Sequence, residues 1–229
     1  MKNKRVEIGQ VALAIETLAV RLGRDRYFFN STVVAKYPVG HAGGELVCDV
    51  FGRACNPIVL FLHGGGQTRH TWENTAKDFV ARGYCAVTVD MKGHGESYWD
   101  DHPVSEFRRY STDAYSKDLD SIVKRMRLHL RPFALVGASL GGLAILNSSL
   151  AKDAAAAIVL VDITPRMNRE GVIRITSWMK HTSNSGFASL EDAAAAIQLY
   201  KPSSKARDVA YLAGLRKNLR QNKDGRFGK

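Results

Sequence analysis

The segment Val136–Gly142 reads Val-Gly-Ala-Ser-Leu-Gly-Gly and separates the apolar run Phe133–Val136 from a helix-like run. A Gly-x-Ser-x-Gly pattern at a strand-to-helix turn is typical of a nucleophile elbow, which exposes the serine hydroxyl on a sharp bend. Side chains beside the serine must be very small at so tight a turn, and Gly137 and Gly141 meet that need. The segment therefore predicts a buried strand, a bend that carries Ser139, and a helix.

Apolar runs alternate with helical patterns from residue 57 to residue 165. Three more runs have the near-continuous apolar character of strands buried on both faces: Pro57–Leu62, Tyr84–Val89 and Ala154–Val161. Helical patterns separate them, the longest from Ser111 or Thr112 to about Leu130. This rhythm predicts the α/β class, with a doubly wound, mostly parallel sheet and helices on both faces. Ligand sites in such sheets lie at the carboxyl ends of the strands.

The flanking regions differ from this core. Helical spacing over Val6–Leu22 predicts a helix outside the core, and Tyr27–Tyr37 reads as a strand. Helical patterns also cover residues 169–182, 189–200 and 204–221, and no strand pattern follows them. We therefore expect an N-terminal helix and strand in residues 1–44, the α/β core in 45–165, and a helical cap segment in 166–229.

Composition narrows the classes of protein. The 229 residues are 45% hydrophobic and 24% charged, and no apolar run is long enough to cross a bilayer. The basic start followed by an apolar stretch suggests a signal peptide, but Glu7 and Glu16 interrupt that stretch, so we expect a cytoplasmic protein without a membrane partner. The cysteines Cys48, Cys55 and Cys85 fit neither a disulfide framework nor a zinc pattern. No metal site is expected.

The net charge of +11 is concentrated near the end of the sequence, where residues 201–229 hold nine Lys or Arg and two Asp. A basic segment of this kind binds nucleic acid or anionic lipid in some proteins. No interleaved aromatic residues or known binding module accompany the charges, so a solvated helix face followed by a frayed end explains them better. We therefore expect no nucleic acid partner.

The loops after residues 62 and 89 complete the pattern. His63-Gly64-Gly65-Gly66 follows a buried strand but lacks both the Gly-Lys-Ser/Thr of a phosphate loop and the spacing of a dinucleotide loop. Asp90 to Ser97 reads Asp-Met-Lys-Gly-His-Gly-Glu-Ser. With the elbow, these loops resemble the α/β-hydrolase superfamily in its esterase, epoxide hydrolase and haloperoxidase-like branch. The resemblance covers roughly residues 45–229 and implies no metal or organic cofactor.

The resemblance implies a role for particular residues. Ser139 would be the nucleophile, and a serine at this position implies acyl transfer. The N–H groups of Leu140, Gly65 and Gly66 would form the oxyanion hole. The alternative for Ser139 is a small residue that merely fits a tight turn. His63 and His94 are expected to brace their loops rather than to transfer protons.

The resemblance also implies a base and an acid that serve the serine. Asp162 follows the strand after the elbow and is a candidate acid, its alternative being a loop carboxylate that caps a helix. The catalytic histidine of the superfamily follows a final strand, and none of the chain's histidines matches that place: His41, His63, His70, His94, His102, His129 and His181. The last strands of the fold are therefore expected to be missing. A truncated reading frame, a domain fragment, and completion by a second copy that covers the open sheet edge all remain open.

The sequence thus supports two hypotheses. The first is a serine hydrolase that acts on a small-molecule ester or related acyl substrate through an acyl-enzyme on Ser139. The second is an inactive, truncated hydrolase or a ligand-binding scaffold that lacks the catalytic histidine. The histidine after a final strand is the sequence feature that separates them.

Overall fold

A computed structural model describes residues 32–39, 44–99, 109–163, 168–200, 209–221 and 224–228. The helix expected over Val6–Leu22 and the start of the strand expected from Tyr27 lie outside the described residues. Among the helices described, none is long and apolar enough to cross a membrane.

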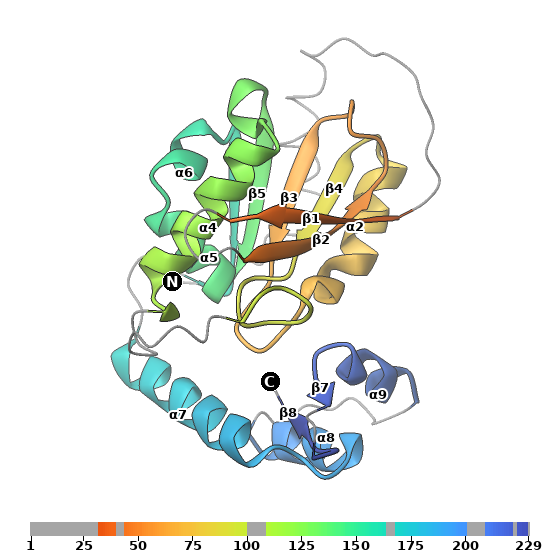
Figure 1. The fold of residues 1–229 in the computed structure, drawn as a ribbon, viewed down its shortest axis with the longest axis vertical. Coiled ribbons are helices and arrows are strands. Elements are labelled where there is room, and N and C mark those ends of the chain that lie inside the picture. The colour runs from red at the N-terminus through yellow and green to blue at the C-terminus, as the bar shows by residue number, and fades with distance from the viewer. Residues whose placement is uncertain are drawn as a thin grey trace, which may run out of the picture.

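The core is one six-stranded sheet with the order β1-β2-β4-β3-β5-β6 (Figure 1). Its strands are β1 Val33–Pro38, β2 Glu45–Phe51, β3 Ile58–Leu62, β4 Cys85–Val89, β5 Phe133–Ala138 and β6 Ala157–Val161. β4, β3, β5 and β6 are parallel, whereas β1 and β2 form antiparallel pairs with their neighbours. The predicted fold class, a doubly wound and mostly parallel sheet, is confirmed.

Helices cover both faces of the sheet. The helix α2 (Glu73–Ala81) follows the short 3-10 helix η1 (Arg69–Trp72) and packs on one face, where Phe79 meets Phe61 of β3. The opposite face carries α4 (Thr112–Arg125), the 3-10 turn η2 (Leu128–Leu130), α5 (Leu140–Asn147) and α6 (Leu150–Ala154). Alternate residues of β3, β4 and β5 supply the two cores, as expected for strands buried on both faces. The same expectation is wrong for the run Ala154–Val161: Ala154 ends α6, and β6 is an edge strand of the described sheet with Ile158 and Val161 exposed.

Two sequence predictions in the core are refined. The Ser111 hydroxyl accepts the N–H of Ala114 and so caps α4, as one of the two expected start residues. β1 pairs along its whole length with β2, so the main sheet begins at Val33 rather than at the expected boundary of residue 45.

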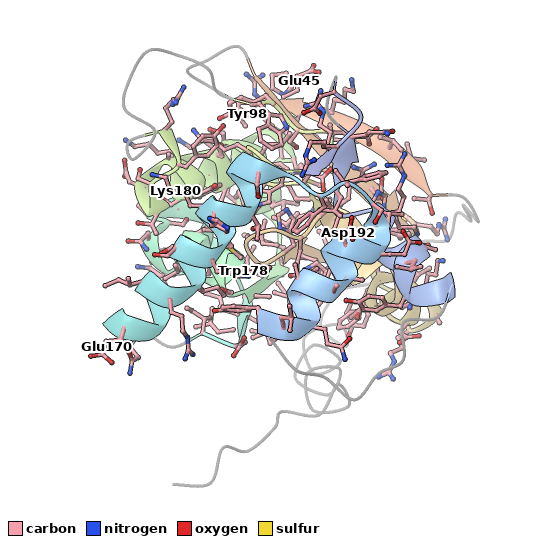
Figure 2. The ribbon with its side chains drawn as sticks, turned by 90° about the horizontal axis from the view of Figure 1, so that it is seen from below. Glu45, Tyr98, Glu170, Trp178, Lys180 and Asp192 are labelled. Carbon is pink, nitrogen blue, oxygen red and sulfur yellow. The ribbon has the colours of Figure 1, made fainter. Side chains whose placement is uncertain are left out.

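The helical segment expected as a cap follows β6 and lies across one end of the sheet (Figure 1); we refer to it as the cap segment. It contains α7 (Arg169–Ser185), α8 (Leu190–Tyr200) and α9 (Val209–Arg216). In the view from the cap side, α7 and α8 pass in front of the core (Figure 2). Trp178 of α7 stacks on Tyr200 of α8 with ring centroids 4.5 Å apart, which joins the two helices.

The third helix expected in this segment is present as α9, but its predicted end at Gln221 and the prediction that no strand follows are wrong. α9 ends at Arg216, and β7 (Arg220–Gln221) pairs antiparallel with β8 (Phe227–Gly228). The Asp224 carboxylate accepts the N–H of Arg226, and Gly225 has φ +82°. This Asp-Gly turn reverses the chain between β7 and β8.

Candidate active site

Ser139 occupies the bend between β5 and α5 with φ 45° and ψ −106°. Positive φ is costly for a residue other than glycine and persists only where the surroundings enforce it. A Cβ on Gly141 would lie 2.5 Å from the carbonyl oxygen of Leu62, and one on Gly137 would lie 2.7 Å from the backbone of Gly141. The two glycines therefore allow the bend that the sequence pattern predicts.

The loop after β3 lies directly beside Ser139. A Cβ on Gly64 would be 3.6 Å from the Ser139 Cβ, and the N–H of Gly141 donates to the carbonyl of His63 at 3.1 Å. The first turn of α5 is thus attached to the start of the glycine loop. An acyl carbonyl bound at Ser139 would meet backbone N–H groups from both elements.

The three glycine N–H groups of the loop have different partners. The Gly64 N–H donates to Gln67 Oε1 at 3.0 Å, and the Gly66 N–H donates to His94 Nε2 at 3.0 Å. Within the described part of the chain, the N–H groups of Gly65 and Leu140 have no acceptor. Gly66 was expected in the oxyanion hole, but its N–H is already bound to His94, so Gly65 and Leu140 are the remaining candidates.

His63 and His94 brace the two loops, as expected. His63 Nε2 accepts the N–H of Met91 at 3.0 Å, and its Nδ1 lies 2.8 Å from the carbonyl oxygen of Gly64. His94 Nδ1 lies 3.0 Å from the carbonyl oxygen of Lys92. Since the other nitrogen of each ring accepts a backbone N–H, Nδ1 carries the proton in both rings.

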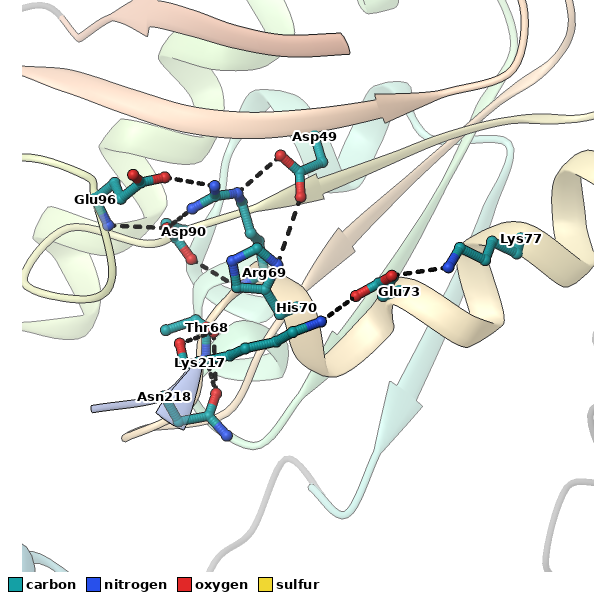
Figure 3. A network of polar contacts seen from close by, with 10 residues as sticks. All are labelled: Asp49, Thr68, Arg69, His70, Glu73, Lys77, Asp90, Glu96, Lys217 and Asn218. Carbon is teal, nitrogen blue, oxygen red and sulfur yellow. Dashed lines mark hydrogen bonds and ion pairs between the residues drawn. The ribbon is translucent and has the colours of Figure 1, made fainter. Parts of the chain in front are cut away.

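An ionic cluster around the buried Arg69 supports the same loops (Figure 3). Arg69 is only 4% exposed; its Nε donates to Asp49 at 2.9 Å, its Nη1 to Asp90 at 2.5 Å and its Nη2 to Glu96 at 2.5 Å. Burial lowers the pKa of Arg69, but the carboxylates of Asp90 and Asp49 outweigh it and shift that pKa upward. Arg69 therefore stays charged and joins β2 to the loops after β3 and β4. No local sequence pattern indicates this cluster.

The cap contacts the glycine loop at two places. On α7, Met179 Cε lies 3.6 Å from the position that a Cβ on Gly65 would occupy. After α9, Asn218 Oδ1 accepts the N–H of Thr68 at 3.1 Å, and the Lys217 carbonyl accepts the Thr68 hydroxyl at 3.0 Å. The cap segment therefore lies over the loop that carries Gly65.

A cavity of about 470 Å³ opens beside the contact between Thr68 and the residues after α9, and Gln67, His94 and Arg220 are among its lining residues.

Asp162 lies at the carboxyl end of β6, next to the strand that carries the elbow. It is exposed and has φ 53°, and the N–H of Ser139 donates to the carbonyl of the preceding Val161 at 3.0 Å. Asp162 is therefore one strand away from Ser139 on the same sheet edge. No hydrogen bond joins the two side chains.

A base for Ser139 is not visible in the described residues. Of the chain's histidines, His41 and His102 lie outside these residues, and none of the other five hydrogen-bonds to the Ser139 hydroxyl. His181, a candidate in the cap, is exposed on α7. No group of three His, Cys, Asp or Glu side chains among the described residues is placed to hold a metal ion.

Comparison with known proteins agrees with this geometry. The model of a family described as the alpha/beta hydrolase fold matches residues 57–197. An esterase of Mycobacterium tuberculosis is 42% identical over 112 residues, which are 48% of this chain and 34% of that protein. Protein phosphatase methylesterase 1 of Mus musculus is 26% identical over 141 residues, 60% of this chain and 35% of that enzyme. The matched segments thus span about a third of these relatives' lengths.

A solved structure extends the agreement to the fold. An alpha/beta hydrolase from Novosphingobium aromaticivorans superposes with a TM-score of 0.69 at 23% identity and covers 87% of this chain and 68% of that one. At this identity the likeness shows the shared fold.

Proposed function

This chain belongs to the alpha/beta hydrolase fold family, and from that premise we propose that it is a serine hydrolase that cleaves small carboxylic esters. The observation that carries the proposal is Ser139 at positive φ, beside a glycine loop whose Gly65 N–H has no acceptor among the described residues. The likeness to an esterase and to a methylesterase supports an ester as substrate.

In the proposed reaction, Ser139 Oγ forms a bond to the carbonyl carbon of the ester while a base removes its proton. The N–H groups of Gly65 and Leu140 stabilise the oxyanion, and each such donor contributes about 3 kcal/mol to the transition state. The carbon–oxygen bond to the alcohol then breaks, and the alcohol leaves with the proton. Water attacks the acyl-enzyme in the same way and releases the acid and free Ser139.

By family resemblance the base is a histidine oriented by a carboxylate, and Asp162 is the candidate for that carboxylate. Its place supports the proposal, because it follows the strand adjacent to the elbow strand and lies at the same sheet edge. A histidine held by Asp162 would approach Ser139 from the β6 side.

A ligand-binding scaffold without turnover is the second candidate. The scaffold is favoured because both ring nitrogens of His63 and of His94 lie within hydrogen-bond distance of backbone groups, so these nitrogens are not directed at Ser139. Such a protein would keep the loop and the elbow but would hold an acyl compound without cleaving it.

Hydrolysis of p-nitrophenyl acetate by the purified chain separates the two candidates. We expect turnover that is lost in Ser139→Ala and retained in Ser121→Ala, a matched change on α4, where the Ser121 hydroxyl donates to the Lys117 carbonyl of the same helix. Equal background rates in all three proteins would contradict the hydrolase and favour the scaffold.

A further inference from the structure

The glycine loop depends on outside partners for its conformation. Three consecutive glycines, Gly64, Gly65 and Gly66, have wide backbone freedom, so their own torsions do not fix the direction of each N–H. Gln67 takes the Gly64 N–H and His94 takes the Gly66 N–H. Only the middle N–H, that of Gly65, is left without an acceptor among the described residues.

His94 presents its acceptor from a rigid support. Its Nδ1–H donates to the Lys92 carbonyl at 3.0 Å, which fixes the tautomer and leaves the Nε2 lone pair for Gly66. Its ring meets the buried ring of His63 at a centroid distance of 4.9 Å. The following Gly95 has φ 51°, and a Cβ there would lie 2.1 Å from Asp90 Oδ2. The ring is therefore held by its hydrogen bonds and by the contact with His63, although it also lines the cavity.

We propose that His94 is a positioning residue for ester hydrolysis: by accepting the Gly66 N–H, it holds the loop so that the Gly65 N–H faces the oxyanion. The inference rests on the proposed function. Gly66 has φ +74°, and the hydrogen bond from its N–H to His94 holds it in this conformation. Without that acceptor the turn would relax, and the direction of the neighbouring Gly65 N–H would change. A displacement of about 1 Å at a catalytic group costs about a hundredfold in rate.

The geometry argues against His94 as the base. A base needs a lone pair directed at the Ser139 proton, whereas Nε2 of His94 is directed at Gly66 and Nδ1 carries its own proton. The two roles predict different responses to substitution, because an amide can accept a hydrogen bond but cannot take the serine proton.

Two amide substitutions form the test. The amide of glutamine reaches the place of Nε2, so His94→Gln keeps an acceptor for Gly66, whereas His94→Asn reaches only the place of Nδ1. With p-nitrophenyl acetate we expect His94→Asn to lower kcat by roughly tenfold to a hundredfold with KM unchanged. His94→Gln should recover most of kcat. His129→Asn, an exposed position on η2, is the matched control and should resemble the wild type.

Equal kcat in His94→Asn and the wild type would overturn the proposal, as would equal loss in both amide variants, which would indicate a base. A loss expressed only in KM would also contradict it.

A measurement without turnover separates this inference from the proposed function. In ¹⁵N-labelled Ser139→Ala protein, we expect a scalar coupling across the hydrogen bond between the Gly66 amide nitrogen and His94 Nε2. A coupling observed alongside absent hydrolysis in the wild type would remove the proposed function but keep the positioning of the loop. An absent coupling would overturn the inference even if Ser139-dependent hydrolysis is found.

Discussion

Asp90 binds Arg69 twice, through the backbone N–H of Arg69 at 2.6 Å and through its Nη1 at 2.5 Å. The carboxylate is fully buried and also accepts the N–H of Glu96 at 3.0 Å. One carboxylate thus fixes the end of the glycine loop and the loop after β4 to each other. The guanidinium adds β2 to this assembly through Asp49.

Removing the Arg69 charge should destabilise the core strongly. Arg69→Met leaves the buried carboxylates of Asp49 and Asp90 without their cation. Removal of one partner from a buried ion pair lowers the free energy of unfolding by about 3–5 kcal/mol. Urea unfolding followed by circular dichroism measures the change, with the exposed Arg125→Met on α4 as control. A loss no larger than that of the control would show that the cluster does not stabilise the fold.

The elbow glycines should tolerate no side chain, in contrast to a glycine in the cap. Gly141→Ala places a methyl 2.5 Å from the Leu62 carbonyl oxygen, and overpacking of this kind costs about 1–3 kcal/mol or more. Gly214→Ala in α9 meets nothing within 4 Å and should stabilise by roughly 0.4–1 kcal/mol. The midpoints of urea unfolding compare the two variants, and equal shifts would contradict the packing at the elbow.

The attachment of the cap to α2 should depend on pH. Hydrogen bonds from Lys217 and Lys77 lower the pKa of Glu73 from 4.5 to about 2. The native state therefore favours the ionised carboxylate, so this contribution to stability is complete above about pH 4.5 and disappears as the pH falls towards 2. We expect Glu73→Gln to be less stable than the wild type at pH 6 and equally stable near pH 2.

Unfolding curves at several pH values measure this difference, and Asp113→Asn is the control, since its exposed carboxylate pairs with exposed Lys117 on the same helix. A difference between wild type and Glu73→Gln that stays constant from pH 6 to pH 2 would contradict the assignment. The pair is partly exposed, so the difference should be modest, about 1 kcal/mol or less.

Met179 should limit the size of the acyl group. Its methyl lies over Gly65, 3.6 Å from the position of an added Cβ, so a larger side chain would close the space above the proposed oxyanion hole. We expect Met179→Ala to raise kcat/KM for p-nitrophenyl butyrate relative to the acetate, and Met179→Trp to lower it. Exposed Ile173 on the same helix provides the control Ile173→Ala. An unchanged ratio in both Met179 variants would place the acyl group elsewhere.

The strands and the elbow were predictable because each is a local pattern. Strands β3, β4 and β5 are buried on both faces and appear as continuous apolar runs, and the bend at Ser139 needs its two flanking glycines. The role of Gly66 was not predictable in this way. Its N–H points to a residue 28 positions away, and that direction follows from φ +74° and from the packing of His94.

The ionic cluster and the hairpin were missed for different reasons. Arg69 lies in a polar stretch, and its contact with Asp49 exists only because β2 is placed beside β4 in the sheet. The β7–β8 hairpin is two residues long on each side, too short to show strand alternation, although its Asp224-Gly225 turn was a usable signal.

The acylation of Ser139 is the central claim, and trapping the intermediate tests it most directly. The chain is mixed with p-nitrophenyl acetate, quenched in acid during turnover and digested, and the peptide that contains Ser139 is examined by mass spectrometry. An acetyl group on Ser139, absent after the Ser139→Ala substitution, is the predicted result. An unmodified Ser139 during measurable release of p-nitrophenol would contradict the account.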